Sequence, residues 1–167
     1  NSLNRKLMRD FRIYMAVGGM PQAVVAYAEG KNFTEIDEVK REIIDLYKDD
    51  FFKIDNSGLI GRMYDSIPGQ LAIDKRSYVT SAATGKKKID KDQERLYDLL
   101  DSKTVLPCYN VHNPSIALSQ TMDSDVFKLY FADTGLFTTM IFNSSKETDS
   151  GIYTKLLSDS LPADLGY

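Results

Sequence analysis

Apolar residues recur every three or four positions in the first third of the chain, a spacing typical of helices with one buried face. The spacing predicts a helix over residues 3–17, a short helix over 22–29 and a long helix over 34–51. Thr34 and Asp37 are spaced like a capping box at the start of the long helix. We expect its core face to comprise Ile36, Val39, Ile43, Ile44, Tyr47 and Phe51.

The helical spacing continues further along and then gives way to alternation. Helices are predicted over 59–67, ending before Pro68, and over 89–100, with 78–84 compatible with a short helix. Alternating patterns predict strands over 105–111 and 126–132, and helical patterns return over 136–142 and 153–157. Three helices followed by two strands is the element order of a winged helix-turn-helix. The predicted fold is therefore mainly α with a small α+β part.

Composition narrows the class of protein. The 167 residues are 27% charged and 43% hydrophobic, with 10 tyrosines and 8 phenylalanines, as in one compact domain or two small ones. No apolar run approaches the roughly 20 residues that a membrane-spanning helix needs. The net charge of −3 argues against a protein that coats nucleic acid. Cys108 is the single cysteine, so it forms no internal disulfide; we expect it to be buried in a strand, and we expect a reducing cytoplasm.

Motifs for catalysis and for nucleotide binding are missing. A phosphate-binding loop needs Gly-x-x-x-x-Gly-Lys followed by Ser or Thr. Gly85-Lys86 is the only Gly-Lys pair, but Thr80 stands where the first glycine should be and Lys87 where the hydroxyl should be. His112 is the only histidine and lies in a loop-like context, so we interpret it as a surface residue. The residues thus predict no catalytic, cofactor-binding or metal site.

A basic cluster is the one candidate for a binding site. It consists of Lys86, Lys87, Lys88, Lys91 and Arg95, at and beside the start of the 89–100 helix. In a winged helix this element would be the recognition helix, and basic residues there would contact DNA phosphates. The alternative, which charge runs generally favour, is a solvated face, because Asp92 and Glu94 interrupt the cluster.

Four segments in order resemble one protein family. They are Gly18-Gly19-Met20-Pro21-Gln22-Ala23-Val24, Asp45-Leu46-Tyr47-Lys48-Asp49-Asp50-Phe51, Ser66-Ile67-Pro68-Gly69-Gln70-Leu71-Ala72 and Phe127-Lys128-Leu129-Tyr130-Phe131-Ala132-Asp133-Thr134-Gly135-Leu136. The set resembles prokaryotic AAA-type ATPases that carry a C-terminal domain of unknown function. In that family a P-loop ATPase domain precedes a helical lid, a winged helix and a restriction-endonuclease-like domain. Gln22 departs from the family's usual Glu.

The resemblance implies a fragment of a putative AAA-family ATP-binding protein. Residues 1–55 would be the helical lid-like bundle, 56–132 the winged helix and 133–167 the incomplete start of the nuclease-like domain, where Asp133 falls. The Walker motifs would lie upstream of Asn1, so ATP and Mg are expected for the full-length parent and no cofactor for this fragment. Its expected partner is the rest of its own ATPase chain, with no membrane. The alternatives are a freestanding winged-helix DNA-binding module and, less favoured, a complete small enzyme.

Overall fold

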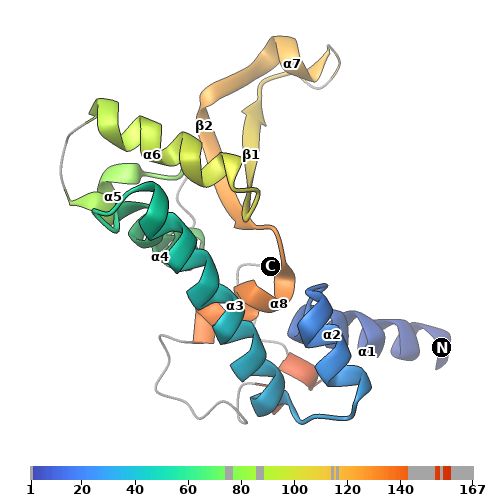
Figure 1. Ribbon diagram of the computed structural model, residues 1–167. Helices are drawn as coiled ribbons and strands as arrows, with labels where there is room; N and C mark the ends of the chain where they lie inside the picture. The colour runs from blue at the N-terminus through green and yellow to red at the C-terminus, as the bar shows by residue number, and fades with distance from the viewer. Residues whose placement is uncertain are drawn as a thin grey trace. The chain divides into compact units, whose positions relative to one another are not determined.

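The computed structural model describes residues 2–73, 77–85, 89–113, 115, 117–142, 153–154 and 156–158. These residues are mainly helical with one two-stranded antiparallel sheet, which confirms the predicted fold class (Figure 1). The elements are α1 (Ser2–Val17), α2 (Pro21–Ala28), α3 (Phe33–Ile54), α4 (Leu59–Ala72), α5 (Thr80–Thr84), α6 (Ile89–Asp101), β1 (Val105–Val111), α7 (Leu118–Thr121), β2 (Met122–Phe131) and α8 (Thr134–Phe142).

The chain forms two compact units. Unit 1 combines the described residues up to Asp49 with those from Asp133 onward, and unit 2 is Asp50–Ala132. The boundaries predicted after residues 55 and 132 lie near the observed ones, which follow Asp49 and Ala132. The observed first boundary falls inside α3 and not after it. The helix α8 was expected to begin a separate domain, yet it belongs to unit 1. Its residues 135–140 are all buried, and the helix packs against α1, which removes its apolar side chains from water.

A capping box starts α3, but it is not the one that the sequence suggested. The Asn32 Oδ1 accepts the Glu35 N–H at 3.0 Å, and the Glu35 Oε2 accepts the Asn32 N–H at 2.9 Å. The two side chains satisfy amides that the first helical turn leaves without partners. Thr34 and Asp37 lie inside the helix instead, and Asp37 is 2% exposed.

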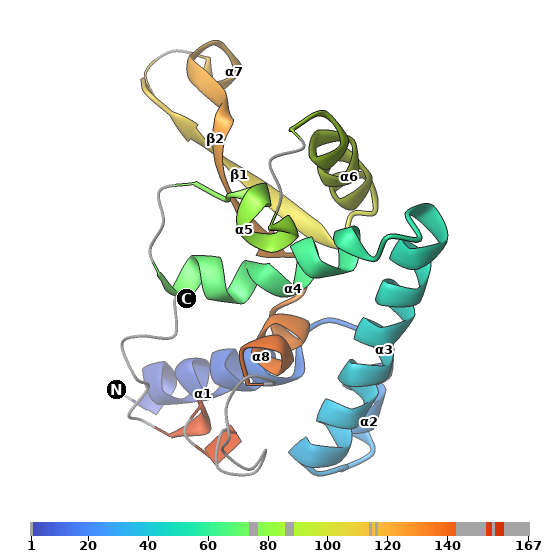
Figure 2. The same ribbon diagram turned by 90° about the vertical axis from the view of Figure 1, so that its left-hand side faces the viewer.

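Unit 1 is built around the contact of α1 with α8, which lie side by side (Figure 2). Met15 and Ala16 at the end of α1 pack with Tyr153 and Leu156, and Phe33 joins this cluster. A second cluster joins the end of α1 to α2 and α3 through Val17, Ala23, Ala26 and Ile36. Ile43 and Ile44 are 7% and 4% exposed, which confirms the predicted core face of α3.

In unit 2 the end of α3 and the helices α4, α5 and α6 precede the β1–β2 hairpin, which carries α7 at its tip (Figure 1). The helix α4 packs against α5, α6 and β2. Tyr64 of α4 is fully buried, with its ring centroid 5.5 Å from that of Phe51 and 4.5 Å from that of Phe131. These aromatic contacts join the end of α3, the middle of α4 and the end of β2 into one core.

The helix α4 continues through Pro68, where the sequence predicted an end. Proline lacks the N–H that would bond to the carbonyl of Tyr64, so the helix loses one hydrogen bond there. Gln70 in the next turn makes two bonds to the backbone of Val79: its Nε2 donates to the carbonyl at 3.2 Å, and its Oε1 accepts the N–H at 2.7 Å. The tertiary bonds of Gln70 hold the last turn of α4 in place.

The first strand of the hairpin, β1, has the predicted bounds, but β2 begins four residues before its predicted start and the pairing is irregular. Val105 pairs with Phe131 and Tyr109 with Phe127, and the register shifts between Tyr109 and Asn110. The four residues Met122–Asp125, which precede the predicted strand over 126–132, belong to β2. The prediction that Cys108 is buried is wrong, because its side chain is exposed. Side chains two apart in a strand share a face, and Cys108 shares the exposed face of Leu106.

Candidate functional site

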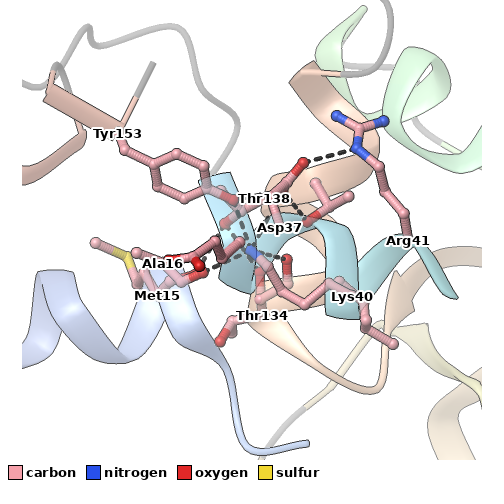
Figure 3. A network of polar contacts seen from close by, with 12 residues as sticks. Met15, Ala16, Asp37, Lys40, Arg41, Thr134, Thr138 and Tyr153 are labelled. Atoms are coloured by element: carbon pink, nitrogen blue, oxygen red, sulfur yellow. Dashed lines mark hydrogen bonds and ion pairs between the residues drawn. The ribbon is translucent and has the colours of Figure 1, made fainter. Parts of the chain in front are cut away.

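A buried lysine lies at the centre of unit 1. Lys40 projects from the core face of α3 and is completely inaccessible to solvent. Its Nζ donates to the carbonyl of Ala16 at 2.8 Å, to the hydroxyl of Tyr153 at 2.7 Å and to the carbonyl of Gly135 at 3.3 Å (Figure 3). An ammonium has three protons, and each finds an acceptor here. Lys40 thus joins α1, α3, α8 and the segment of Tyr153.

Asp37, one turn earlier on α3, is the acidic member of the cluster. Its Oδ1 accepts the Tyr153 hydroxyl at 2.5 Å and the Thr139 hydroxyl at 2.7 Å, and its Oδ2 accepts the Arg41 Nε at 2.7 Å. The Lys40 Nζ lies 3.6 Å from Oδ1. A buried carboxylate with this many donors is well compensated for the loss of water.

Burial and pairing shift the protonation of all three groups. Burial lowers the pKa of Lys40 to about 8, against the opposing charge of Asp37. Burial also raises the pKa of Asp37, but the hydrogen bonds from Tyr153 and Thr139 and the nearby cations bring it below its ordinary value. The pKa of Tyr153 is raised by burial and by the charge of Asp37. At neutral pH the cluster is therefore a cation, an anion and a neutral phenol.

A second set of contacts ties the turn after α1 to the start of α8. The Asp133 Oδ2 accepts the Gly19 N–H at 2.6 Å, and its Oδ1 accepts the Leu136 N–H at 2.8 Å, so this carboxylate also caps α8. Gly18 has φ +80°, and a Cβ placed on it would lie 2.3 Å from the Asp133 Oδ1. Only glycine combines that backbone conformation with so close an approach.

The two sets of contacts hold the fold together rather than presenting reactive groups. Asp37, Lys40, Thr138, Thr139 and Tyr153 are each 3% exposed or less, so the polar groups of this cluster face one another and not solvent. The Thr138 hydroxyl donates to the carbonyl of Met15 at 2.9 Å, which adds a bond between α8 and α1. The arrangement fastens the two chain segments of unit 1 to each other.

The predicted basic cluster is only partly described. Lys86, Lys87 and Lys88 lie outside the described residues. Lys91 is exposed on α6. The Arg95 Nε lies 2.5 Å from the Asp55 Oδ2, and its Nη1 lies 3.2 Å from the Asp92 Oδ1. The guanidinium is thus already paired with two carboxylates of its own unit, while Asp92 also accepts the Thr84 hydroxyl at 2.8 Å.

His112 lies on the surface, as expected, with its side chain 63% exposed and its Nε2 3.8 Å from the Asp123 Oδ2. Across the described ranges, no three His, Cys, Asp or Glu side chains gather as metal ligands would. In the same part of the chain, no helix combines the length and the apolar character needed to cross a bilayer.

Sequence reasoning missed the buried cluster, although one signal for it was present. Lys40 lies four residues after Ile36 and four before Ile44, which places a charge in the middle of the predicted apolar face. A lysine at such a position either directs its amine to solvent or has its buried charge paired with acceptors inside the core. Its acceptors come from segments about 24 and 95 residues away, so periodicity along α3 did not reveal them.

Comparison with known proteins gives a family but no described activity. No curated protein and no solved structure matches the chain. The family described as a domain of unknown function (DUF8612) matches residues 8–147. The match spans the whole of unit 2 and part of each segment of unit 1, with Asp37, Lys40 and Asp133 inside it and Tyr153 beyond its end. The chain therefore belongs to the DUF8612 family.

Proposed function

We propose that this chain is the non-catalytic connecting part of a cytoplasmic AAA-type ATPase, in which unit 1 is lid-like and unit 2 is a winged helix. The observation that carries the proposal is that unit 2 is inserted in unit 1. The chain enters unit 2 inside the continuous helix α3 and leaves it through the two residues between β2 and α8. Both connections are short, so a movement of unit 1 would act on both ends of unit 2 at once.

The segments that resemble the ATPase family support this assignment because each makes a defined tertiary contact. Gly18 and Gly19 meet Asp133, which joins the first segment to the last. Phe51 packs on Tyr64 within unit 2, and Gln70 holds the backbone of Val79. We would expect such contacts if these segments form a rigid framework. A framework of this kind would transmit a conformational change of an attached ATPase domain.

The charge of α6 favours a protein-facing role over the alternative of DNA binding. In a winged helix, α6 would be the recognition helix. It carries five acidic residues and two basic ones, a net charge of −3. Phosphate backbones are bound by positive surfaces, and a helix with this charge would repel them. Arg95 is moreover occupied by Asp55 and Asp92.

Calorimetric titration with Mg-ATP tests the connecting role. The isolated chain should give no saturable heat, because its sequence lacks the Gly-x-x-x-x-Gly-Lys-Ser/Thr motif whose amides and lysine bind phosphates. The reading frame upstream of the codon for Asn1 should encode Gly-x-x-x-x-Gly-Lys followed by Ser or Thr. Micromolar ATP binding by this chain, or an upstream frame without that motif, would contradict the proposal.

Fluorescence anisotropy with a labelled duplex tests the DNA-binding alternative. If Lys86, Lys87, Lys88, Lys91 and Arg95 contacted phosphates, the log–log salt slope would be roughly −4, and a Lys88→Ala, Lys91→Ala double variant would flatten it by about 2. Glu94→Gln is the matched control, since it removes a charge from the same helix and should strengthen such binding. We expect no binding at low salt, and a slope of this size would favour the DNA-binding module.

A further inference from the structure

The helix α1 exposes a continuous apolar face. Leu3, Leu7, Met8, Phe11 and Tyr14 are between 45% and 70% exposed. They recur every three or four positions apart from one adjacent pair, so they form one stripe along the helix, which we call the α1 stripe. Five large apolar side chains in a contiguous exposed row are unusual on a soluble protein and mark an interaction surface.

The other exposed side chains of α1 are mostly basic. The helix carries Arg5, Lys6, Arg9 and Arg12 against the single acid Asp10, a net charge of +3. Arg5, Lys6 and Arg9 are all exposed. A partner that buries the stripe would therefore bind more strongly if acidic side chains lie at its edges.

A groove of matching character runs between α2 and α3. Its volume is about 490 Å³. Its apolar side chains are Pro21, Val25, Ala26, Val39, Ile43 and Leu46, and its polar ones are Gln22, Glu29, Lys31 and Glu42. Val25 and Leu46 are 54% and 61% exposed, so the groove presents apolar surface to a ligand. The charged residues of the groove are Glu29, Glu42 and Lys31, which give it a net charge of −1.

We propose that the α1 stripe of one copy of this chain lies in the α2–α3 groove of a second copy. A helix in a groove is anchored by apolar residues spaced like those of the stripe. The +3 charge of α1 and the −1 charge of the groove lining are opposite in sign. Within one copy the stripe and the groove are both exposed, so neither covers the other. This inference is independent of the ATPase assignment.

The contact joins two different surfaces, both of which every copy carries. It is therefore either reciprocal within a dimer or repeated from head to tail. One helix in a groove lies at the small end of protein interfaces, below about 1,200 Å² of total buried area. We accordingly expect association at micromolar concentrations.

Sedimentation equilibrium of the 167-residue chain measures this association. The average mass should rise from 18.9 kDa with concentration over about two decades around the micromolar range. A stripe variant, Leu7→Glu with Phe11→Glu, and a groove variant, Val25→Glu with Leu46→Glu, should each remain monomeric. An equal mixture of the two should form a heterodimer, because each variant contributes the one surface that the other lacks. All four side chains are exposed, so thermal melting should confirm unchanged folding.

Charge reversal provides a second readout with a matched control. Arg9→Glu and Glu42→Arg should each weaken association about tenfold or more, and combining them in one chain should restore it in part. Glu94→Arg makes the same change of charge as Glu42→Arg at an exposed position of α6, which belongs to neither surface, and should leave association unchanged.

Several outcomes would overturn the proposal. A wild-type chain that stays at 18.9 kDa throughout has no such contact. A groove variant that associates as well as wild type would show that stripes pair with each other instead. A monomeric wild type whose α1 binds anionic phospholipid vesicles would assign the stripe to a membrane surface.

Discussion

Replacing Gly18 by alanine tests the junction between the two segments of unit 1, and Gly30 supplies a matched control. Both glycines have φ +80°. A Cβ on Gly30 would meet nothing within 4 Å, whereas a Cβ on Gly18 would lie 2.3 Å from the Asp133 Oδ1 and 2.8 Å from the Gly135 amide nitrogen. The pair thus separates the cost of the backbone conformation from the cost of the collision.

The expected magnitudes follow from the contacts. A left-handed conformation costs an L-residue about 1–2 kcal/mol, so Gly30→Ala should lose about that much of the free energy of unfolding. Gly18→Ala pays the same cost and must also displace the Asp133 carboxylate, which accepts two backbone N–H groups. Hydrogen bonds to charged groups contribute about 1.5–3 kcal/mol each. We expect Gly18→Ala to be destabilised by about 3 kcal/mol more than Gly30→Ala.

Urea unfolding followed by circular dichroism measures both values on the same chain. The double variant Gly18→Ala, Asp133→Ala should cost less than the sum of its single changes, because removing the carboxylate removes the nearest obstacle to the new methyl group. If Gly18→Ala and Gly30→Ala agree within about 0.5 kcal/mol, the junction does not hold unit 1 together and the reasoning fails.

Three further predictions use the same measurement. Ile43→Ala should lower the free energy of unfolding by about 2–5 kcal/mol, because the side chain is 7% exposed. Leu46→Ala, at 61% exposure, should lower it little. Equal losses for the two variants would show that the core face of α3 is misplaced. Asn32→Ala should cost about 1 kcal/mol by removing the capping box, and Thr34→Ala should cost less. The pKa of Lys40 is about 8 when folded and 10.5 in a free chain, so between these values the unfolded chain binds more protons and stability rises with pH. Between about pH 7.5 and 9.5, wild type should therefore gain about 2 kcal/mol relative to Lys40→Met, and an unchanged difference would show that Lys40 does not titrate in this range.

Local pattern was sufficient for most elements and for part of the core. The spacing of apolar residues along α3 placed Ile43 and Ile44 inside, because a helix that buries one face repeats every three to four residues whatever it packs against. Alternation placed β1 at Val105–Val111 for the same kind of reason. The prediction that Cys108 is buried was wrong, because alternation shows that the two faces of a strand differ but does not show which face is buried in the core.

Tertiary structure decided the features that depend on partners distant in the chain. Pro68 ends a helix by local rules, yet α4 continues through it, and Gln70 in its last turn bonds to the backbone of Val79, beyond the end of the helix. Asp37 resembled a capping residue, yet it compensates Lys40 beside Thr139 and Tyr153, which lie more than 100 residues further on. The sequence by itself determined which residues avoid water along each helix and strand, because that preference is local. Which buried charges meet, and that α8 completes unit 1, was decided only when distant segments packed together.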